Sequence, residues 1–248
     1  MVDISQRELY EEYSNRINWD MGRKLRYWIA KSTLKSIASD LTIDYADIEL
    51  LEFGCGDGLM GEVALALGAK GYTGIEPTPE LAQSAQRRLG DKQILETPLP
   101  NVDHSLENRF DLVLAVMVLE HAGSPIEASQ WMRAMSTCLN EAGNLVIVCP
   151  DYFSYGHYFW DIDWSHSFPT TQERLEQIAK GLNLRVLDST RIRAGTSQLW
   201  IRALLSICSK LIPTQLLDAL GSIAIGRRLG RGVQAGLLWS SVRIVVAK

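Results

Sequence analysis

Apolar runs and amphipathic segments alternate along the chain from residue 48 onward. The apolar runs are continuous rather than alternating with polar residues, which is typical of parallel strands covered on both faces. The segments between them repeat apolar residues at helical spacing. The pattern predicts strands at Ile48–Gly54, Tyr72–Glu76, Gln93–Glu96, Phe110–Met117 and Asn144–Cys149, and helices at Leu59–Leu67, Pro79–Leu89 and Pro125–Leu139. We therefore expect an α/β fold with a mostly parallel sheet.

The first forty residues also have a helical pattern. Leu25, Trp28, Ile29, Leu34 and Ile37 fall near one face of such a helix. An N-terminal helical element of this kind can cover a ligand cleft, or its apolar and aromatic residues can simply pack on the sheet. The pattern leaves both arrangements open.

Composition limits the compartment and the number of domains. The 248 residues suffice for one well-buried domain with an appendage, and the net charge of −4 gives no general reason to expect nucleic-acid binding. The four cysteines form no C-x-x-C pair, so their spacing predicts neither a disulfide framework nor a metal site. The first residues lack the basic and apolar regions of a secretory signal. We expect a cytoplasmic protein without a metal ion.

A turn with three alternating glycines follows the first predicted strand. Gly54, Gly56 and Gly58 lie between that strand and the next predicted helix. Without a Cβ atom, the backbone of such a turn can closely approach a nucleotide-like ligand at a helix N-terminus. The unit predicts a site for a cofactor that carries adenosine.

Two features near this turn indicate different cofactors. Gly56–Gly61 satisfies the G-x-G-x-x-G pattern of dinucleotide sites, and Glu76 follows Gly56 by twenty residues, which favours NAD. Glu52, however, places a carboxylate just before the first glycine. That position must stay free for a pyrophosphate, whereas a carboxylate there suits a cationic ammonium or sulfonium group.

The acidic-x-Gly-x-Gly-x-Gly series formed by Glu52, Gly54, Gly56 and Gly58 resembles the first motif of the class I S-adenosylmethionine (SAM)-dependent methyltransferases. The resemblance implies a Rossmann-like sandwich with a seven-stranded sheet that closes with an antiparallel pair, at Leu184–Ile192 and Leu238–Ala247. The length of the chain predicts a single domain over residues 1–248. Its parts are a helical cap (1–45), a core (46–193 and 237–248) and an amphipathic helical-hairpin insertion before the last strand (194–236).

The resemblance also assigns cofactor contacts to the ends of the predicted strands. Glu76 would accept both ribose hydroxyls, Glu96 would meet the adenine amino group, and Met117 would begin the loop behind the cofactor. His121 in that loop is equally well explained as a structural residue. The predicted cofactor residues are Glu52, Gly54, Gly56, Gly58, Glu76, Glu96 and Met117.

The segment 150–171 is dense in aromatic and polar residues, a composition suited to binding sugar or ring faces. Within it, Asp163-x-x-His166-x-Phe168, followed by a helix from Thr170 to Lys180, resembles a sub-group of these methyltransferases that acts on small molecules and sugars. The resemblance implies His166 as the general base and Asp163 as the residue that orients it or binds the acceptor. His166 can equally pin the loop to the sheet.

The predicted insertion differs chemically from the rest of the chain. Between Arg191 and Arg231 there are seven basic residues and one acidic residue. Leu199–Ile212 and Leu216–Ile225 read as helices with narrow polar stripes, too short or too charged to span a membrane. Residues 199–231 would contact an anionic membrane surface, cover a substrate or form a homodimer, or pack plainly on the core. We do not expect nucleic-acid binding.

Together these patterns predict a SAM-dependent methyltransferase (EC 2.1.1.-) that methylates an oxygen atom of a small molecule or glycan, lipid-linked glycans included. One alternative acceptor is a quinone or another apolar metabolite. Another alternative is a non-catalytic partner protein that keeps the methyltransferase fold. The expected location is the cytoplasm, at the inner face of the membrane if the insertion binds lipid.

Overall fold

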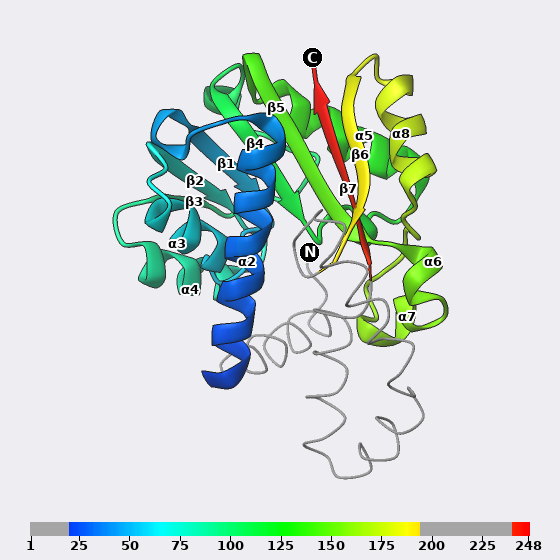
Figure 1. The fold of residues 1–248 in the computed structure, drawn as a ribbon, viewed down its shortest axis with the longest axis horizontal. Helices are drawn as coiled ribbons and strands as arrows, with labels where there is room; N and C mark the ends of the chain where they lie inside the picture. Colours follow the sequence, from blue (N-terminus) through cyan, green and yellow to red (C-terminus); the bar gives the residue numbers. More distant parts are fainter. Residues whose placement is uncertain (1–19, 194–239) are drawn as a thin grey trace.

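A seven-stranded sheet organises the computed structural model, which describes residues 20–193 and 240–248 (Figure 1). The strands lie in the order β3-β2-β1-β4-β5-β7-β6. Their bounds are β1 (Glu49–Phe53), β2 (Gly71–Ile75), β3 (Gln93–Leu95), β4 (Phe110–Val116), β5 (Leu139–Pro150), β6 (Arg185–Ile192) and β7 (Ser241–Ala247). Strands β1 to β5 are parallel, and β7 is antiparallel to both β5 and β6. The predicted Rossmann-like sheet and its closing antiparallel pair are therefore confirmed.

Helices cover both faces of the sheet. Their bounds are α2 (Asp20–Leu41), α3 (Leu59–Ala66), α4 (Pro79–Leu89), α5 (Pro125–Thr137), α6 (Tyr152–Tyr155), α7 (Tyr158–Ile162) and α8 (Gln172–Gly181), with 3-10 turns η1 (Tyr45–Asp47), η2 (His104–Leu106) and η3 (Leu119–His121). Helices α2, α3 and α4 pack on one face through a core that includes Leu50, and α5 and α8 pack on the other through a core that includes Leu51. Successive residues of β1 thus point into opposite cores, as expected for a strand buried on both faces.

Most predicted boundaries hold within two residues, and β5 is the main exception. It begins at Leu139 rather than Asn144, and α5 ends at Thr137, so the predicted helix is too long at its C-terminus. The extra strand residues pair irregularly, with Phe110 opposite Leu139 before the regular register starts at Leu112. Within this irregular stretch, the Asn140 side chain donates a hydrogen bond to the Asp111 carboxylate of β4.

Helix α2 both packs on the sheet and borders the ligand cavity, so the two arrangements expected for the N-terminal element coexist. Leu34 and Ile37 are buried in the core, while Arg26 and Ala30 line the cavity. At its C-terminal end, the guanidinium of Arg243 from β7 binds Ser36 and Asp40. These contacts link the helix to β7. Figure 1 shows α2 lying across the sheet.

Several predictions concern residues outside the described ranges. The insertion at residues 194–236, its two expected helices and the proposed contact surface at residues 199–231 all lie there, as do the first nineteen residues. Within residues 20–193 and 240–248, none of the helices combines the length and hydrophobicity that a bilayer span requires.

Candidate functional site

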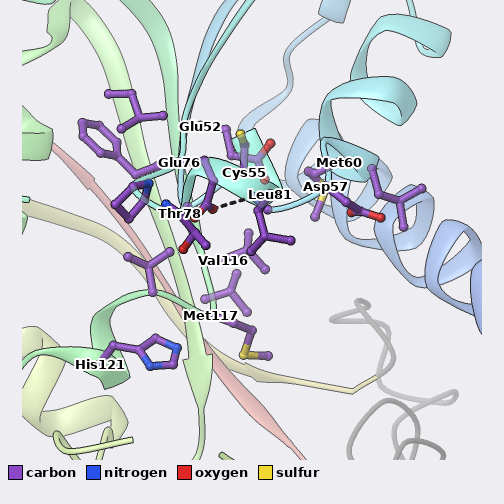
Figure 2. A pocket seen from close by; sticks show the side chains of 18 of the residues that line it. Glu52, Cys55, Asp57, Met60, Glu76, Thr78, Leu81, Val116, Met117 and His121 are labelled. Carbon is purple, nitrogen blue, oxygen red and sulfur yellow. Dashed lines mark hydrogen bonds between the residues drawn. The ribbon is translucent and has the colours of Figure 1, made fainter. Parts of the chain in front are cut away.

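A cavity of about 510 Å³ opens at the carboxyl ends of β1, β2 and β4 (Figure 2). Open α/β sheets bind their ligands at this edge, where the strand order reverses. Of the residues predicted to bind cofactor or acceptor, Glu52, Gly54, Gly56, Glu76, Met117 and Asp163 line the cavity. Gly58, Glu96 and His166 are not part of its lining.

In the glycine turn between β1 and α3, one glycine packs tightly against the protein and another faces open space. Gly54 has a φ of +67°, and a Cβ there would lie 2.6 Å from Val118 Cγ2. Gly56 has a φ of +57°, but no atom of the described residues lies within 4 Å of where its Cβ would be. Because Gly56 lines the cavity, its missing side chain leaves room for a ligand against the backbone.

Glu76, at the end of β2, links the second strand to this turn. Its Oε2 accepts a hydrogen bond from the Gly56 nitrogen at 2.9 Å, and its Oε1 accepts one from the Thr78 nitrogen at 2.9 Å. Burial raises the pKa of the Glu76 carboxyl, while these backbone hydrogen bonds lower it. Each carboxylate oxygen keeps a further acceptor site, so the group can still accept a hydrogen bond from a ligand hydroxyl.

Glu52 forms part of the cavity wall on the other side of the turn. Its side chain is buried, and the Tyr72 hydroxyl donates a 2.5 Å hydrogen bond to its Oε2. Burial raises the pKa of Glu52 to about 8, so the carboxyl is mostly protonated near neutral pH when no cation lies beside it. A bound cation would favour the ionised form and lower that pKa. The site is thus suited to a positively charged ligand group.

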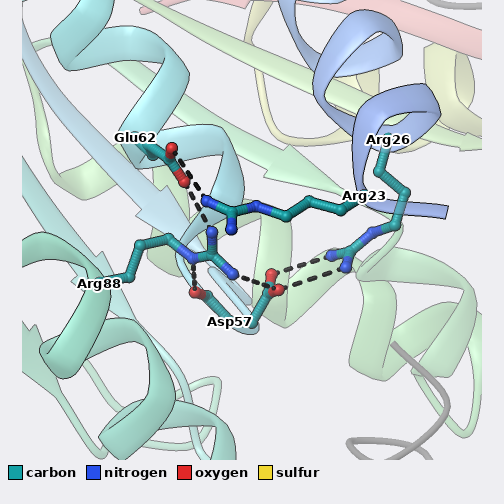
Figure 3. A network of polar contacts seen from close by, with 5 residues as sticks. All are labelled: Arg23, Arg26, Asp57, Glu62 and Arg88. Atoms are coloured by element: carbon teal, nitrogen blue, oxygen red, sulfur yellow. Dashed lines mark hydrogen bonds and ion pairs between the residues drawn. The ribbon is translucent and has the colours of Figure 1, made fainter. Parts of the chain in front are cut away.

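An ion-pair network around Asp57 holds the turn at the rim of the cavity and was not predicted from the sequence (Figure 3). The buried Asp57 carboxylate binds Arg26 of α2 at 2.9 Å and Arg88 of α4 at 2.9 Å. Arg88 also donates to the Asp57 carbonyl and binds Glu62 of α3. The network therefore joins three helices at the turn. The only signal in the sequence was an acidic residue between two motif glycines.

The far end of the cavity carries Met117, His121 and Asp163. Met117 has a φ of +58° and is 40% exposed at the end of β4. Ser165 Oγ donates to Asp163 Oδ1 at 2.6 Å, so it accepts from His121 Nδ1, which lies 2.8 Å away. Burial lowers the pKa of His121, which keeps the imidazole neutral near pH 7. His121 is thus a lining residue, whereas the sequence left its role open.

His166, predicted as the general base, lies behind this wall. Its side chain is buried, and its Nδ1 lies 2.6 Å from the Phe159 carbonyl oxygen. Its ring packs against His121, with 5.0 Å between the ring centroids. A proton from a ligand in the cavity would meet His121 or Asp163 before His166.

The adenine end of the expected cofactor also differs from the prediction. Glu96 is exposed, and Thr97, Pro98 and Leu99 line the cavity in its place. Trp131 of α5 lines the same cavity, and its buried indole nitrogen has no hydrogen-bond partner among the described residues. No sequence motif marked Trp131, because it lies on a helix distant from the glycine turn.

Comparison with known proteins agrees with this geometry. Residues 21–189, more than half of the chain, match the family model described as "Methyltransferase domain". A segment of 124 residues is 31% identical to the ribosomal protein L11 methyltransferase of Marinomonas sp. (strain MWYL1) and covers 46% of this chain. The match covers 41% of that protein, so the chain spans about two fifths of its length.

Two solved structures share the fold over most of the chain. A methyltransferase in complex with the Haloferax volcanii Trm112 methyltransferase activator has a TM-score of 0.64 and 14% identity, with 92% of each chain covered. The plantazolicin methyltransferase BpumL, in complex with SAH (S-adenosylhomocysteine), has a TM-score of 0.61 and 16% identity, with 100% of this chain and 91% of that chain covered. At 14% and 16% identity, these similarities show a shared fold and nothing about the acceptor.

Proposed function

Because this chain belongs to the methyltransferase domain family and is a class I SAM-dependent methyltransferase, we propose that it methylates an oxygen atom of a small molecule or glycan. The observation that carries this proposal is that Asp163, which belongs to the aromatic segment 150–171, lines the cavity. Methyl transfer from a sulfonium is an in-line displacement, so the protein must chiefly align acceptor, methyl group and sulfur. The acceptor must therefore enter where the cofactor cavity meets that segment.

We further propose how the cofactor lies. Glu76 would accept the ribose hydroxyls, Gly56 would allow close approach of the backbone, and Glu52 would offset the positive charge of the methionyl end. The cavity has room for these groups, and Thr97, Leu99 and Trp131 surround its other end. This arrangement directs the sulfonium toward Met117 and toward the part of the lining formed by His121 and Asp163, which we call the acceptor wall.

The acceptor wall suits a hydroxyl-bearing ring. Asp163 and His121 offer polar atoms at the cavity surface. Trp160 and Trp164, near Asp163 in sequence but outside the cavity lining, are 46% and 54% exposed. Indole faces stack well on sugar or aromatic rings, while the carboxylate and imidazole can hydrogen-bond a hydroxyl. The same exposed aromatic side chains would also stack on the ring of a quinol, the more apolar alternative acceptor.

A protein acceptor is the second candidate. The matched curated relatives are named as ribosomal protein L11 methyltransferases, and the first of them matches at 31% identity. The matched segment covers less than half of that relative, so it leaves the acceptor of this chain open. The two candidates differ in the class of acceptor, a small hydroxyl compound or a protein.

Methyl-labelled SAM distinguishes these acceptors. The purified chain is incubated with labelled SAM and, separately, with methyl glycosides, a water-soluble quinol and purified ribosomal protein L11. We expect label in a hydroxyl compound. We expect no label when the same compound is supplied with its hydroxyl groups already methylated. Asp163→Ala should reduce this transfer at least tenfold while SAH affinity stays within a factor of two, because Asp163 lies at the acceptor end. Label transferred to L11 alone would contradict the proposal.

A further inference from the structure

Three metal-ligand side chains meet directly behind the acceptor wall. Glu120 and His121 belong to η3, and His166 belongs to the segment after α7. One ligand atom from each lies within 4.8 Å of the other two. Glu120 and His166 are buried, while His121 also reaches the cavity. The methyl-transfer arrangement proposed above uses neither Glu120 nor His166.

Glu120 is the feature that calls for an explanation. Its side chain is 0% exposed, and neither carboxyl oxygen has a hydrogen-bond partner among the described residues. The adjoining Cys149 thiol is a weak donor at best. A buried carboxyl without partners costs several kcal/mol if ionised, so such groups are normally paired or coordinate a metal ion. No arginine or lysine binds Glu120 in the described part of the chain.

Both histidines are held so that one ring nitrogen stays available. The Phe159 carbonyl can only accept, so His166 Nδ1 carries the proton and, in the neutral ring, Nε2 keeps its lone pair. His121 Nδ1 likewise donates to Ser165 Oγ, which is itself bonded to Asp163. Metal-binding histidines typically donate their second ring nitrogen to a carbonyl or to a group held by a carboxylate, because that bond fixes the ring and the tautomer.

The backbone holds the two segments in place. The Glu120 carbonyl oxygen accepts hydrogen bonds from the nitrogens of Ser167 and Phe168, both at 2.9 Å. These bonds set η3 against the segment that follows His166, independently of any ligand. The three side chains therefore face one another on a scaffold that is already formed.

We propose that Glu120, His121 and His166 bind a divalent transition-metal ion, for which Zn²⁺ is the test ion. Two imidazoles and one carboxylate are a common ligand set for this class of ion. Metal–ligand bonds of about 2.0–2.2 Å require donor atoms no more than about 4.4 Å apart, so small side-chain rotations would close the site. Three protein ligands leave a coordination position open, and the site adjoins the wall where the acceptor hydroxyl would lie. A bound ion there would lower the pKa of a coordinated hydroxyl.

Direct metal binding tests this proposal without any acceptor. Tag-free protein is stripped with a chelator, dialysed against Zn²⁺ and analysed for bound metal by mass spectrometry. We expect one equivalent in the wild type, and an affinity at least tenfold weaker in both Glu120→Gln and His166→Asn. His104→Ala is the matched control: His104 lies 2.7 Å from Glu107, but this histidine–carboxylate pair is exposed, so its loss should leave zinc binding unchanged.

Two further readouts keep the result clear. SAH affinity and thermal melting without zinc show whether each variant is folded, and they test the cofactor site separately from the metal site. Substitution with Co²⁺ should give the visible bands of nitrogen and oxygen ligands without a thiolate charge-transfer band. Absence of zinc binding in the wild type, unchanged binding in the two folded variants, or a cobalt–thiolate band would each overturn the proposal.

Discussion

The Glu76 carboxylate and the Gly56 backbone nitrogen are joined by a 2.9 Å hydrogen bond, although they lie twenty residues apart in the chain. The bond connects the end of β2 to the glycine turn after β1, and both groups line the same cavity. A second hydrogen bond, from the Thr78 nitrogen, fixes the other carboxylate oxygen. The residue predicted to bind the ribose therefore also shapes the turn that would lie beneath the cofactor.

Replacing Glu76 should consequently weaken cofactor binding through two effects. Glu76→Ala removes the ribose acceptor and frees the Gly56 nitrogen, and a hydrogen bond to a charged group contributes about 1.5–3 kcal/mol. We expect SAM and SAH affinities, measured by calorimetric titration, to fall at least tenfold. Glu76→Gln keeps one acceptor oxygen and should fall between the alanine variant and the wild type. Equal SAH affinity in all three proteins would mean that Glu76 does not contact the cofactor.

Two glycines of the turn should respond differently to the same added methyl group. Gly56→Ala adds only the left-handed backbone strain of about 1–2 kcal/mol, because nothing lies near its Cβ position. Gly54→Ala carries the same strain and also a contact of 2.6 Å with Val118. Overpacking of that kind adds roughly 1–3 kcal/mol. Urea denaturation should therefore show the larger loss of stability for Gly54→Ala.

Cofactor affinity gives the complementary result at these positions. The methyl group of Gly56→Ala would enter the cavity, so SAH binding should weaken more than the small loss of stability suggests. A Gly56→Ala protein that binds SAH like the wild type would show that the ligand does not approach this part of the turn.

The sequence predicted the parallel strands and most element boundaries because the apolar runs and the glycine turn are local signals. Glu52, Gly56 and Glu76 were found at the cavity for the same reason, since each lies within two residues of the end of a predicted strand. Asp57 shows where local signals stop. Its partners Arg26 and Arg88 lie 31 residues away on either side, so only the packed helices bring them together.

The segment after β5 shows a second limit. Its composition indicated an acceptor loop, but the composition cannot tell which way each side chain faces. Short helices α6 and α7 turn His166 inward, toward the Phe159 carbonyl, and leave Asp163 at the cavity wall. Both residues are named by one spacing pattern, and only the fold separates the lining residue from the buried one.

The Asp57 network should contribute measurably to stability. Removing one member of a buried ion pair typically costs 3–5 kcal/mol, because the remaining charge stays buried without its partner. Arg88 is mostly buried, but the Arg26 side chain is 35% exposed and is partly screened by solvent. We therefore expect a loss of about 3 kcal/mol for Asp57→Ala, measured by urea denaturation.

Arg23 offers a matched control on the same helix as Arg26. Its side chain is 56% exposed and lies 3.5 Å from Glu62, so Arg23→Ala should change stability by less than about 0.5 kcal/mol. Similar losses for Arg23→Ala and Asp57→Ala would indicate that solvent reaches the whole network.

Stability without cofactor should also depend on pH through Glu52. Burial raises the pKa of this carboxyl from about 4.5 to about 8 in the folded chain. A group whose pKa is raised on folding contributes stability that is fully present below its unfolded pKa and is lost as pH rises through the folded one. The wild type should therefore lose stability relative to Glu52→Gln between about pH 4.5 and 8, with no further change above that window.

Denaturation at several pH values, with both proteins in the same buffers, isolates this contribution, because the other titrating groups are common to both. Tyr72→Phe supplies an internal check, since the Tyr72 hydroxyl donates to Glu52 and lowers its pKa. Its removal should extend the window to higher pH. A difference between wild type and Glu52→Gln that is constant from pH 4.5 to 8 would mean that solvent reaches the carboxyl and that its charge is not reserved for a cationic ligand.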